Sequence, residues 1–177
     1  LKYLSYFCKR NNCNLIFDEM ISGVRVDKYS VHKKYKIYPD IVTIGKIVGG
    51  GLPIGIIGIS KKIEKKILNY YKKIFFGGTF SGNSLSTFIG NETLKYLYKK
   101  RNIFQKINNY SEQFQNEVNK YVRLHKIDAK IYRFDSILRI IFSRKKIDNR
   151  VQRDFFEKKK LSKILLFRKF LLKKKNF

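Results

Sequence analysis

The chain alternates between two hydrophobic patterns, one of helical period and one made of short, continuous apolar runs. Continuous apolar runs bounded by polar residues indicate buried strands, whereas apolar residues three or four positions apart indicate helices. Strands are predicted at 14–19, 40–46 and 54–60. Helices are predicted at 1–11, 61–73, 83–99 and 103–121. This alternation favours an α/β fold in which helices cover both faces of a mainly parallel sheet.

The pattern changes after His125. Residues 128–134 and 137–143 have the character of two paired, amphipathic strands, and residues 151–175 have that of a helix. We therefore expect a domain boundary between residues 100 and 128, within or just after the long helix.

The chain is strongly basic. The chain has 177 residues, 44% of them hydrophobic, and a formal net charge of +27, which is typical of proteins that bind nucleic acid or anionic membranes. Its lysines are spread among many Ile, Asn, Tyr and Phe residues, which favours a general compositional bias. Because residues 144–177 hold 14 Lys and Arg against 3 Asp and Glu, a basic nucleic-acid-binding module is kept as the less favoured alternative.

The cysteine count and the apolar runs narrow the class of protein further. Two cysteines, Cys8 and Cys13, are too few for a disulfide framework and have no neighbours that would complete a zinc site. No apolar run reaches the roughly 20 residues that span a bilayer. We expect a cytoplasmic protein with no metal site and no membrane partner.

The candidate chemistry lies where the predicted strands end. Asp18 ends the first strand, and Lys46 ends the second within residues 43–58, a run that is otherwise uncharged and contains six glycines. Ligands of α/β sheets bind outside the carboxyl ends of the strands, so both side chains are expected in one cleft. The glycines at 49–51 would let the backbone turn tightly or approach a ligand closely.

These residues also allow other interpretations. Asp18 and Glu19 alone would also fit a helix cap or a surface turn. The P-loop pattern G-x-x-x-x-G-K-[ST] is absent, and GGGLPIG misses the dinucleotide-binding spacing by one residue. No G-x-S-x-G elbow occurs, and His32 and His125 lack partners at metal-ligand or triad spacing, so we interpret both histidines as surface or packing residues.

A buried lysine and a buried carboxylate in one cleft suit a particular chemistry. A lysine that loses its hydration has a lowered pKa and becomes a nucleophilic amine, as in enzymes that form Schiff bases. Pyridoxal 5′-phosphate (PLP) uses such a lysine, together with an acid beside its pyridine nitrogen, because the protonated ring is the better electron sink. Lys46 and Asp18 would fill these two roles.

Three segments of the chain, LIFDEMISGVRV, PDIVTIGKIVGGGLPIGIIG and GGTFSGNSLS, together resemble the class III aminotransferases. These are PLP-dependent enzymes of fold type I, and the resemblance is greatest to their glutamate-1-semialdehyde aminomutase branch. The segments occur in the family's order, and the 28-residue interval from Asp18 to Lys46 agrees with the family. The similarity extends from residue 1 to about residue 100 and weakens after that.

The resemblance implies a role for each matching residue. Lys46 would form the Schiff base with PLP, and Asp18 would pair with the pyridinium nitrogen. Met20 would lie against one face of the ring. Thr79 would reach the cofactor phosphate of the neighbouring subunit of a homodimer, and Gly78 would let that backbone approach. Taken alone, GGTFSGN is also a loop that caps the following helix, which is compatible with this role because helix N-termini attract phosphate.

The resemblance also implies that the chain is part of a longer enzyme, truncated at both ends, because family members are more than twice its length. Residues 1–110 would form the C-terminal half of the PLP-binding large domain, and residues 111–177 part of an α+β small domain. The missing N-terminal half would supply the phosphate cup and much of the substrate recognition. We therefore expect uncovered apolar faces and unpaired strand edges in the isolated chain.

The implied activity is PLP-dependent amino-group transfer. The amine of Lys46, once displaced by the substrate amine, would move the proton at the substrate Cα as general acid and base. A transaminase would pass the amino group from a small amino donor to a keto or aldehyde substrate, whereas an aminomutase would return it to the neighbouring carbon of the same molecule. The sequence leaves both open, with an inactive fragment of such an enzyme as the alternative.

Overall fold

The computed structural model describes residues 1–26, 30–70, 77–100 and 102–174. The chain divides into two compact units, Leu1–Lys106 and Ile107–Phe177, and helix α5 (Asn102–Leu124) begins in the first and continues in the second. The first unit contains α1 (Lys2–Arg10), β1 (Ile16–Glu19), α2 (Val31–Lys34), β2 (Ile41–Gly45), the 3-10 helix η1 (Lys46–Gly49), β3 (Gly55–Ile59), α3 (Lys61–Tyr70) and α4 (Ser84–Lys99). The second contains β4 (Lys130–Phe134), β5 (Ile137–Ile141), α6 (Arg150–Lys159) and α7 (Leu161–Lys173).

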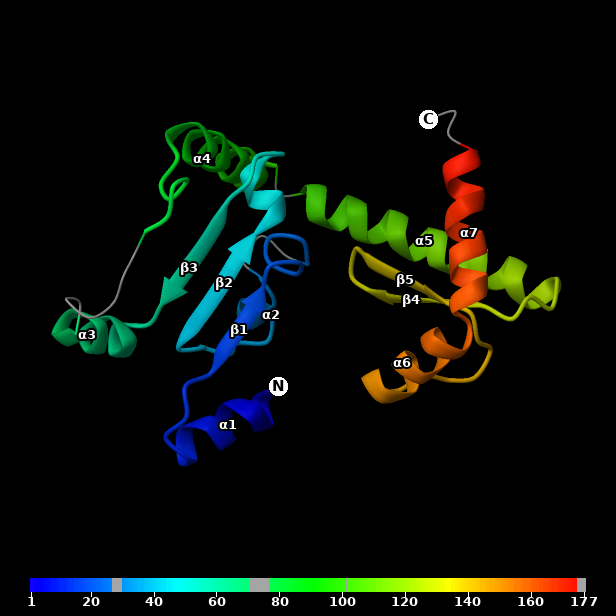
Figure 1. Cartoon of the computed structure of the whole chain (residues 1–177), viewed down its shortest axis with the longest axis horizontal. Coiled ribbons are helices and arrows are strands. Elements are labelled where there is room, and N and C mark those ends of the chain that lie inside the picture. Colours follow the sequence, from blue (N-terminus) through cyan, green and yellow to red (C-terminus); the bar gives the residue numbers. More distant parts are fainter. Residues whose placement is uncertain (27–29, 71–76, 101, 175–177) are drawn as a thin grey trace. The chain divides into compact units, whose positions relative to one another are not determined.

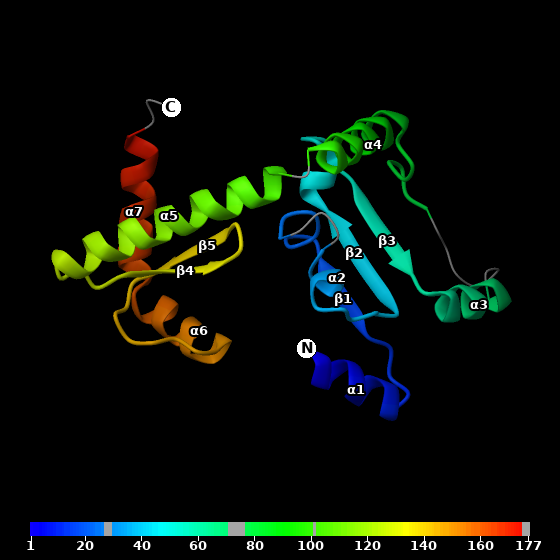
Figure 2. The same ribbon diagram turned by 180° about the vertical axis from the view of Figure 1, so that it is seen from behind.

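The three strands of the first unit form one sheet with β2 in the middle, as Figures 1 and 2 show from opposite sides. β1 pairs with β2 in parallel, as predicted, but β3 runs antiparallel to β2. A mainly parallel sheet can carry an antiparallel edge strand, so this pair does not contradict the predicted fold class. β3 runs antiparallel to β2 because the connection at residues 46–54 is shorter than the dozen or so residues that a parallel crossover requires. The fold remains mixed α/β.

One face of this sheet is packed and the other is open. Side chains alternate between the faces of a strand, and Ile44 and Ile56 fall on the face that contacts a buried apolar cluster. That cluster consists of Val24, Val48, Leu97 and Phe104. The opposite face, which we call the open face, carries Ile16, Asp18, Ile41, Thr43, Ile57 and Ile59, with Ile16 58% and Ile57 70% exposed.

Close backbone approach holds α4 against η1. A Cβ at Gly90 of α4 would lie 3.2 Å from the carbonyl oxygen of Val48, so a small residue is needed there. The turn after η1 needs glycine for a second reason, because Gly50 and Gly51 have φ values of 59° and 104°. A Cβ at Gly50 would also collide with the hydroxyl of Thr93 on α4. The predicted tight turn at residues 50 and 51 is thus confirmed.

The second unit is built on an antiparallel hairpin, β4–β5, along which α5 lies (Figure 1). Asn119 of α5 binds both backbone groups of Ile131: its Nδ2 donates to the carbonyl oxygen at 3.0 Å, and its Oδ1 accepts from the N–H at 2.8 Å. Ser111 Oγ donates to the carbonyl oxygen of Asp135 at 2.8 Å. These contacts bind α5 to β4 alongside the buried Ala129, Ile131 and Ile141.

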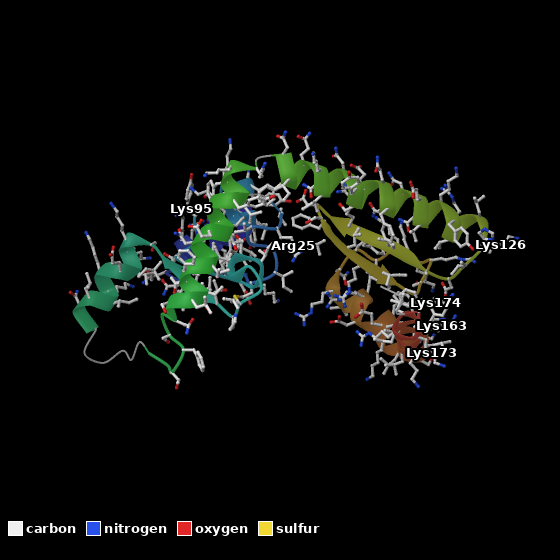
Figure 3. The ribbon with its side chains drawn as sticks, turned by 90° about the horizontal axis from the view of Figure 1, so that it is seen from above. Arg25, Lys95, Lys126, Lys163, Lys173 and Lys174 are labelled. Atoms are coloured by element: carbon white, nitrogen blue, oxygen red, sulfur yellow. The ribbon has the colours of Figure 1, made fainter. Side chains whose placement is uncertain are left out.

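The predicted helix at 151–175 is two helices, because α6 ends and α7 begins around Lys160. The break lets Phe167 of α7 pack edge-on against Phe142, with ring centroids 5.8 Å apart, and lets Lys160 pair with Asp128 at 3.3 Å. Basic side chains gather on and after α7, where Figure 3 labels Lys163, Lys173 and Lys174. Across the described ranges, every helix is too short or too polar to cross a membrane.

Candidate active site

Asp18 and Lys46 lie at neighbouring carboxyl ends of the sheet. Asp18 is opposite Thr43 in the parallel register of β1 and β2, and Lys46 directly follows the end of β2. Because the two strands run in the same direction, both residues fall at the same edge of the sheet. The structure thus brings together the acid and the amine that the sequence singled out.

The Asp18 carboxylate is held by its surroundings on the open face. Its Oδ1 accepts one hydrogen bond from the N–H of Met20 and one from the hydroxyl of Thr43, both at 3.1 Å. Among the described residues, both of its hydrogen bonds use Oδ1, and the residue as a whole is exposed. The carboxylate is therefore fixed in direction by two contacts on one of its oxygens.

Lys46 is the first residue of η1 and adopts a strained backbone. Its φ is 55°, in the left-handed region that residues with a Cβ rarely occupy. Strained conformations of this kind persist where the surrounding structure enforces them, and they are enriched at functional sites. Six other non-glycine residues of the described chain also have positive φ, so the strain is supporting evidence and not proof of a role.

The expected burial of this pair is wrong for the isolated chain, because both Asp18 and Lys46 are exposed. The physical reason is the open face. In the first unit, Ile57 and Ile59 of the same face are also largely exposed, so the described chain supplies one wall of a cleft and not the opposite wall. The apolar surroundings that would desolvate an amine at Lys46 are therefore incomplete here.

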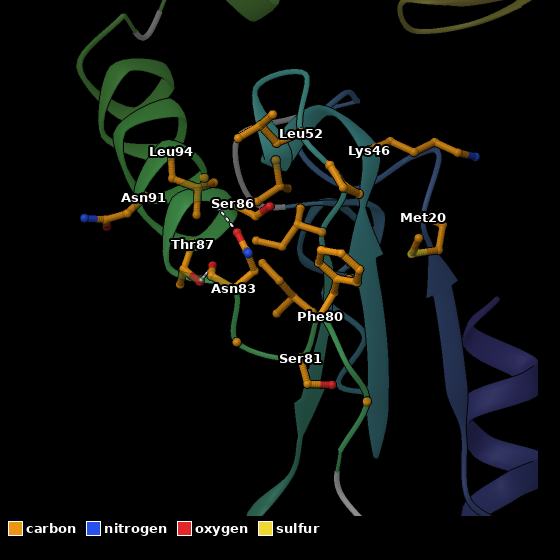
Figure 4. Close-up of a pocket in the computed structure, with 18 residues that line it drawn as sticks. Met20, Lys46, Leu52, Phe80, Ser81, Asn83, Ser86, Thr87, Asn91 and Leu94 are labelled. Carbon is orange, nitrogen blue, oxygen red and sulfur yellow. Dashed lines mark hydrogen bonds between the residues drawn. The ribbon is translucent and has the colours of Figure 1, made fainter.

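A pocket of about 880 Å³ adjoins Lys46, between the β2–β3 connection and the start of α4 (Figure 4). Met20, Lys46 and Gly78 of the predicted site line it, whereas Asp18 and Thr79, both described, do not. The other side chains facing it are mostly apolar or amide. They are Val48, Leu52, Pro53, Ile54, Ile56, Phe80, Ser81, Asn83, Ser86, Thr87, Asn91 and Leu94.

Met20 lies beside the start of the Lys46 side chain because Gly45 has no Cβ. A Cβ at Gly45 would lie 2.5 Å from Met20 Cε and 2.9 Å from the carbonyl oxygen of Ile54. In Figure 4 Met20 and Lys46 stand on one side of the pocket, opposite Asn83, Ser86 and Thr87. Any larger residue at position 45 would displace Met20 from this place.

The turn before α4 supplies exposed donors at the other side of the pocket. The N–H of Ser81 donates to the carbonyl oxygen of Gly78 at 2.9 Å, and Thr79 is exposed at the tip of the turn. Asn83 caps α4 by accepting from the N–H of Ser86 at 3.0 Å. The positive end of a 16-residue helix therefore faces the pocket, and such an end favours phosphate.

The sequence did not indicate that Glu19 is buried: it is 2% exposed and accepts hydrogen bonds from residues 22, 31 and 32. Its bonds to the N–H groups of Val31 and His32 make it a cap of α2, in agreement with the helix-cap interpretation of this residue. His32 was interpreted as a surface or packing residue, and its ring contacts Glu19 at 2.7 Å with 13% of the side chain exposed. The signal that could have found Glu19 is the period of two along a strand, which puts it on the opposite face from Asp18. Within the described ranges no group of three His, Cys, Asp or Glu side chains could hold a metal ion.

Comparison with known proteins gives a consistent result. The sequence model of the family Aminotransferase class-III matches residues 1–155. The chain is 34% identical over 149 residues to the glutamate-1-semialdehyde 2,1-aminomutase of Thermosipho africanus (strain TCF52B), an alignment that covers 84% of this chain and 34% of the relative. The chain thus spans about a third of the length of the curated relatives it matches.

Two solved structures share the fold. An omega-transaminase from Sphaerobacter thermophilus superposes with a TM-score of 0.73 at 22% identity, over 86% of this chain and 36% of that one. A protein from Sphingopyxis sp. MTA144, solved in its PLP internal aldimine form, superposes with a TM-score of 0.70 at 19% identity, over 79% of this chain and 33% of that one. These likenesses confirm the predicted fold class.

Proposed function

The chain belongs to the class-III aminotransferase family, and on this premise we propose that it carries the lysine side of a PLP-dependent amino-transferring site. The observation that carries the proposal is the placement of Asp18 and Lys46 at adjacent carboxyl ends of parallel strands, beside a pocket that ends at the start of α4. The residues present fit PLP: an amine for its aldehyde and a carboxylate for its ring nitrogen, with a turn at a helix N-terminus that would serve the phosphate bound by a second copy.

Bound PLP would supply an electron sink for the charge left at the substrate Cα. The protein's own residues have four tasks around it. The Lys46 amine would link the cofactor and would afterwards move the proton at the substrate Cα. The Asp18 carboxylate would keep a proton on the ring nitrogen, helped by the hydrogen bonds that fix its direction. Met20 would pack against the ring, as expected of an apolar side chain that lines the pocket together with Lys46.

The fourth task, binding of the phosphate, involves a second copy of the chain. We assign it to Thr79 and Gly78, whose turn is exposed. Apolar side chains in and beside this turn are exposed as well: Phe80 by 78%, Leu85 by 60% and Phe88 by 61%. An exposed apolar surface next to a phosphate-binding turn suits a homodimer in which the turn completes the partner's site.

The substrate is a small amino compound, and the curated relatives favour aminomutase chemistry over transfer between two molecules. We assign residues 1–110 to the C-terminal half of the cofactor-binding large domain and residues 111–177 to part of the small domain, which is supported by the division of the chain into two compact units after Lys106. A cytoplasmic location fits the two free thiols, Cys8 and Cys13.

The proposed roles are tested by a half-reaction on the full chain. PLP is bound, a small amino donor is added, and conversion of the cofactor to its amine form is followed by absorbance. Lys46→Ala should lose both the covalent link and the conversion. Asp18→Asn should keep the link but slow the conversion by about a hundredfold or more, because an amide does not hold the ring proton.

The matched control for Lys46 is Lys61→Ala, an exposed lysine at the start of α3. This variant should behave as the unmodified chain does. Conversion at the normal rate by Lys46→Ala would overturn the assignment of the lysine, and conversion at the normal rate by Asp18→Asn would overturn that of the acid.

A further inference from the structure

The buried carboxylate of Glu19 has no role in the proposed chemistry, although the residues on either side of it in the sequence do have roles. Glu19 separates Asp18 from Met20 in the chain and is 2% exposed. Because side chains alternate along β1, Glu19 points to the packed face while Asp18 lies on the open face. Burying a carboxylate is costly unless its oxygens accept hydrogen bonds. The donors to Glu19 therefore show which parts of the backbone it holds in place.

Each oxygen of Glu19 accepts two hydrogen bonds. Oε2 accepts from the N–H of Val31 at 2.8 Å and from the hydroxyl of Ser22 at 3.3 Å. Oε1 accepts from the N–H of His32 at 2.9 Å and contacts the ring Nδ1 of His32 at 2.7 Å, an arrangement in which Nδ1 carries the proton. The carboxylate thereby joins the end of β1 to the start of α2, twelve residues further along.

Two described residues between Glu19 and Val31 have left-handed backbone conformations. Val24 has a φ of 55° and Ser30 a φ of 89°, and a left-handed conformation is especially unfavourable for a β-branched residue such as valine. The backbone also passes very close to Glu19, since a Cβ at Gly23 would lie 2.7 Å from the carbonyl oxygen of Glu19. Strain of this kind persists only when the contacts around it enforce it.

A change in the backbone at Met20 would directly affect the orientation of the Asp18 carboxylate. The N–H of Met20 donates to Asp18 Oδ1 at 3.1 Å, and Met20 is the residue that follows Glu19. If the carboxylate of Glu19 lost its partners, the backbone at Met20 would gain freedom, and Asp18 would lose one of the two hydrogen bonds that orient it.

We propose that Glu19 is a positioning residue for the cofactor site: by tying the start of α2 to the end of β1, it fixes the backbone at Met20 and so the direction of the Asp18 carboxylate. This inference rests on the proposed function, because the roles of Asp18 and Met20 do. Glu19 itself contacts no reacting atom, since it lies on the packed face.

The test is hydrogen exchange of individual amides in the full chain without PLP. Glu19→Gln removes the charge and puts an amide N–H₂ where donors already point. The amides of Val31 and His32 should exchange about tenfold faster or more, as expected from losing hydrogen bonds to a charged acceptor. The amide of Met20 should also exchange at least several-fold faster, although Glu19 does not bind it.

The Met20 amide is the decisive readout, because a residue that merely caps α2 would leave it unchanged. Faster exchange at Val31 and His32 with no change at Met20 would overturn the proposal. Glu64→Gln, which changes an exposed carboxylate in α3, is the matched control and should change none of the three amides. The amide of Leu97, in the buried cluster, reports whether the first unit stays folded.

A milder variant keeps the proposal testable if Glu19→Gln unfolds the first unit. His32→Ala removes the ring contact to Oε1 and leaves the backbone donor in place. It should speed exchange at Met20 by about threefold, in keeping with the loss of a single ordinary hydrogen bond. An unchanged Met20 amide in a folded His32→Ala chain would contradict the proposal.

Failure of this inference is distinguishable from failure of the proposed function. The exchange experiment contains no cofactor, so its outcome does not depend on whether Lys46 binds PLP. A second measurement links the two: the affinity of the chain for PLP should fall about fivefold or more in Glu19→Gln while the covalent link still forms at Lys46. Unchanged affinity with faster exchange at Met20 would show that the backbone is held for another reason, and would overturn the link to the cofactor.

Discussion

Lys46 carries the reactive amine of the proposed site, but its backbone adopts a conformation that is unfavourable for any residue with a Cβ. Its φ of 55° is one that glycine adopts readily, and a residue with a Cβ adopts it at a cost of about 1 kcal/mol or somewhat more. The neighbouring Gly50 and Gly51 take up the rest of the turn without that cost. A side chain at position 46 therefore lowers the stability of the turn. The proposed role of the Lys46 amine explains why this position has a lysine and not a glycine.

This conflict predicts that the two obvious variants of Lys46 differ in stability. Lys46→Gly relieves the left-handed strain, whereas Lys46→Ala keeps it. The free energy of unfolding of Lys46→Gly should exceed that of Lys46→Ala by about 1 kcal/mol. Urea denaturation of both variants measures the difference. A glycine variant less stable than the alanine variant would show that position 46 is not strained.

At the residue scale, the sequence indicates which side chains matter better than it indicates their surroundings. Asp18 and Lys46 could be predicted because each ends an apolar strand. Their exposure could not, because it depends on which faces of the sheet the rest of a protein covers. The burial of Glu19 was not predicted because this residue was considered together with Asp18 as an acidic pair, although strand alternation places the two on opposite faces.

Among the elements, the contact between α5 and β4 shows how a polar side chain replaces a strand partner. The amide of Asn119 binds both the N–H and the carbonyl oxygen of Ile131, and Gln115 donates to the same carbonyl oxygen at 3.0 Å. Ile131 is 5% exposed, so its backbone groups have little access to water. A buried backbone group without a partner is destabilising, which makes this amide a structural anchor of the second unit.

Asn119→Ala should therefore destabilise the second unit by about 1–3 kcal/mol, because it leaves the N–H of Ile131 buried without its acceptor. The measurement is chemical denaturation followed by a probe in the second unit. Asn116→Ala, an exposed asparagine on the same helix, is the control and should be neutral or slightly stabilising, since alanine has the higher helix propensity. Equal stabilities for both variants would argue against an anchoring role of Asn119.

The element order was largely predictable, and the exceptions have physical causes. The predicted mainly parallel sheet did not specify the direction of β3, which is antiparallel because the connection after β2 is too short for a parallel crossover. The C-terminal helix was expected to be continuous, but the packing of Phe167 on Phe142 requires a break near Lys160. The short helix α2 was not predicted, because Glu19 supplies the acceptors for its first N–H groups from a distant part of the sequence.

At the scale of the whole molecule, the chain combines a high positive charge with an uncovered apolar face. Its net charge of +27 makes copies repel one another, whereas Ile16, Ile57 and Ile59 on the open face favour contact with another surface. Repulsion between exposed charges is screened over about 10 Å at 0.1 M salt. Which tendency prevails should therefore depend on the ionic strength.

We expect the isolated chain to self-associate increasingly as the salt concentration rises, through the open face. Ile57→Lys places a charge on β3, an edge strand of the described sheet, and should reduce the association measured by light scattering. Val151→Lys, which changes a 79% exposed apolar residue of the second unit, is the control and should have a smaller effect. If the control reduces association as strongly as Ile57→Lys does, the open face is not the contact surface.

The most direct test of the central claim is to find which lysine binds PLP. The full chain is incubated with PLP, reduced with borohydride and digested, and the modified lysines are identified by mass spectrometry, with a sample unfolded in urea as the background for random labelling. The proposed site predicts that Lys46 is modified in preference to every other lysine and that unfolding abolishes this preference. Labelling spread over the surface lysines, with Lys46 no more modified than in the unfolded sample, would contradict the account and favour an inactive fragment.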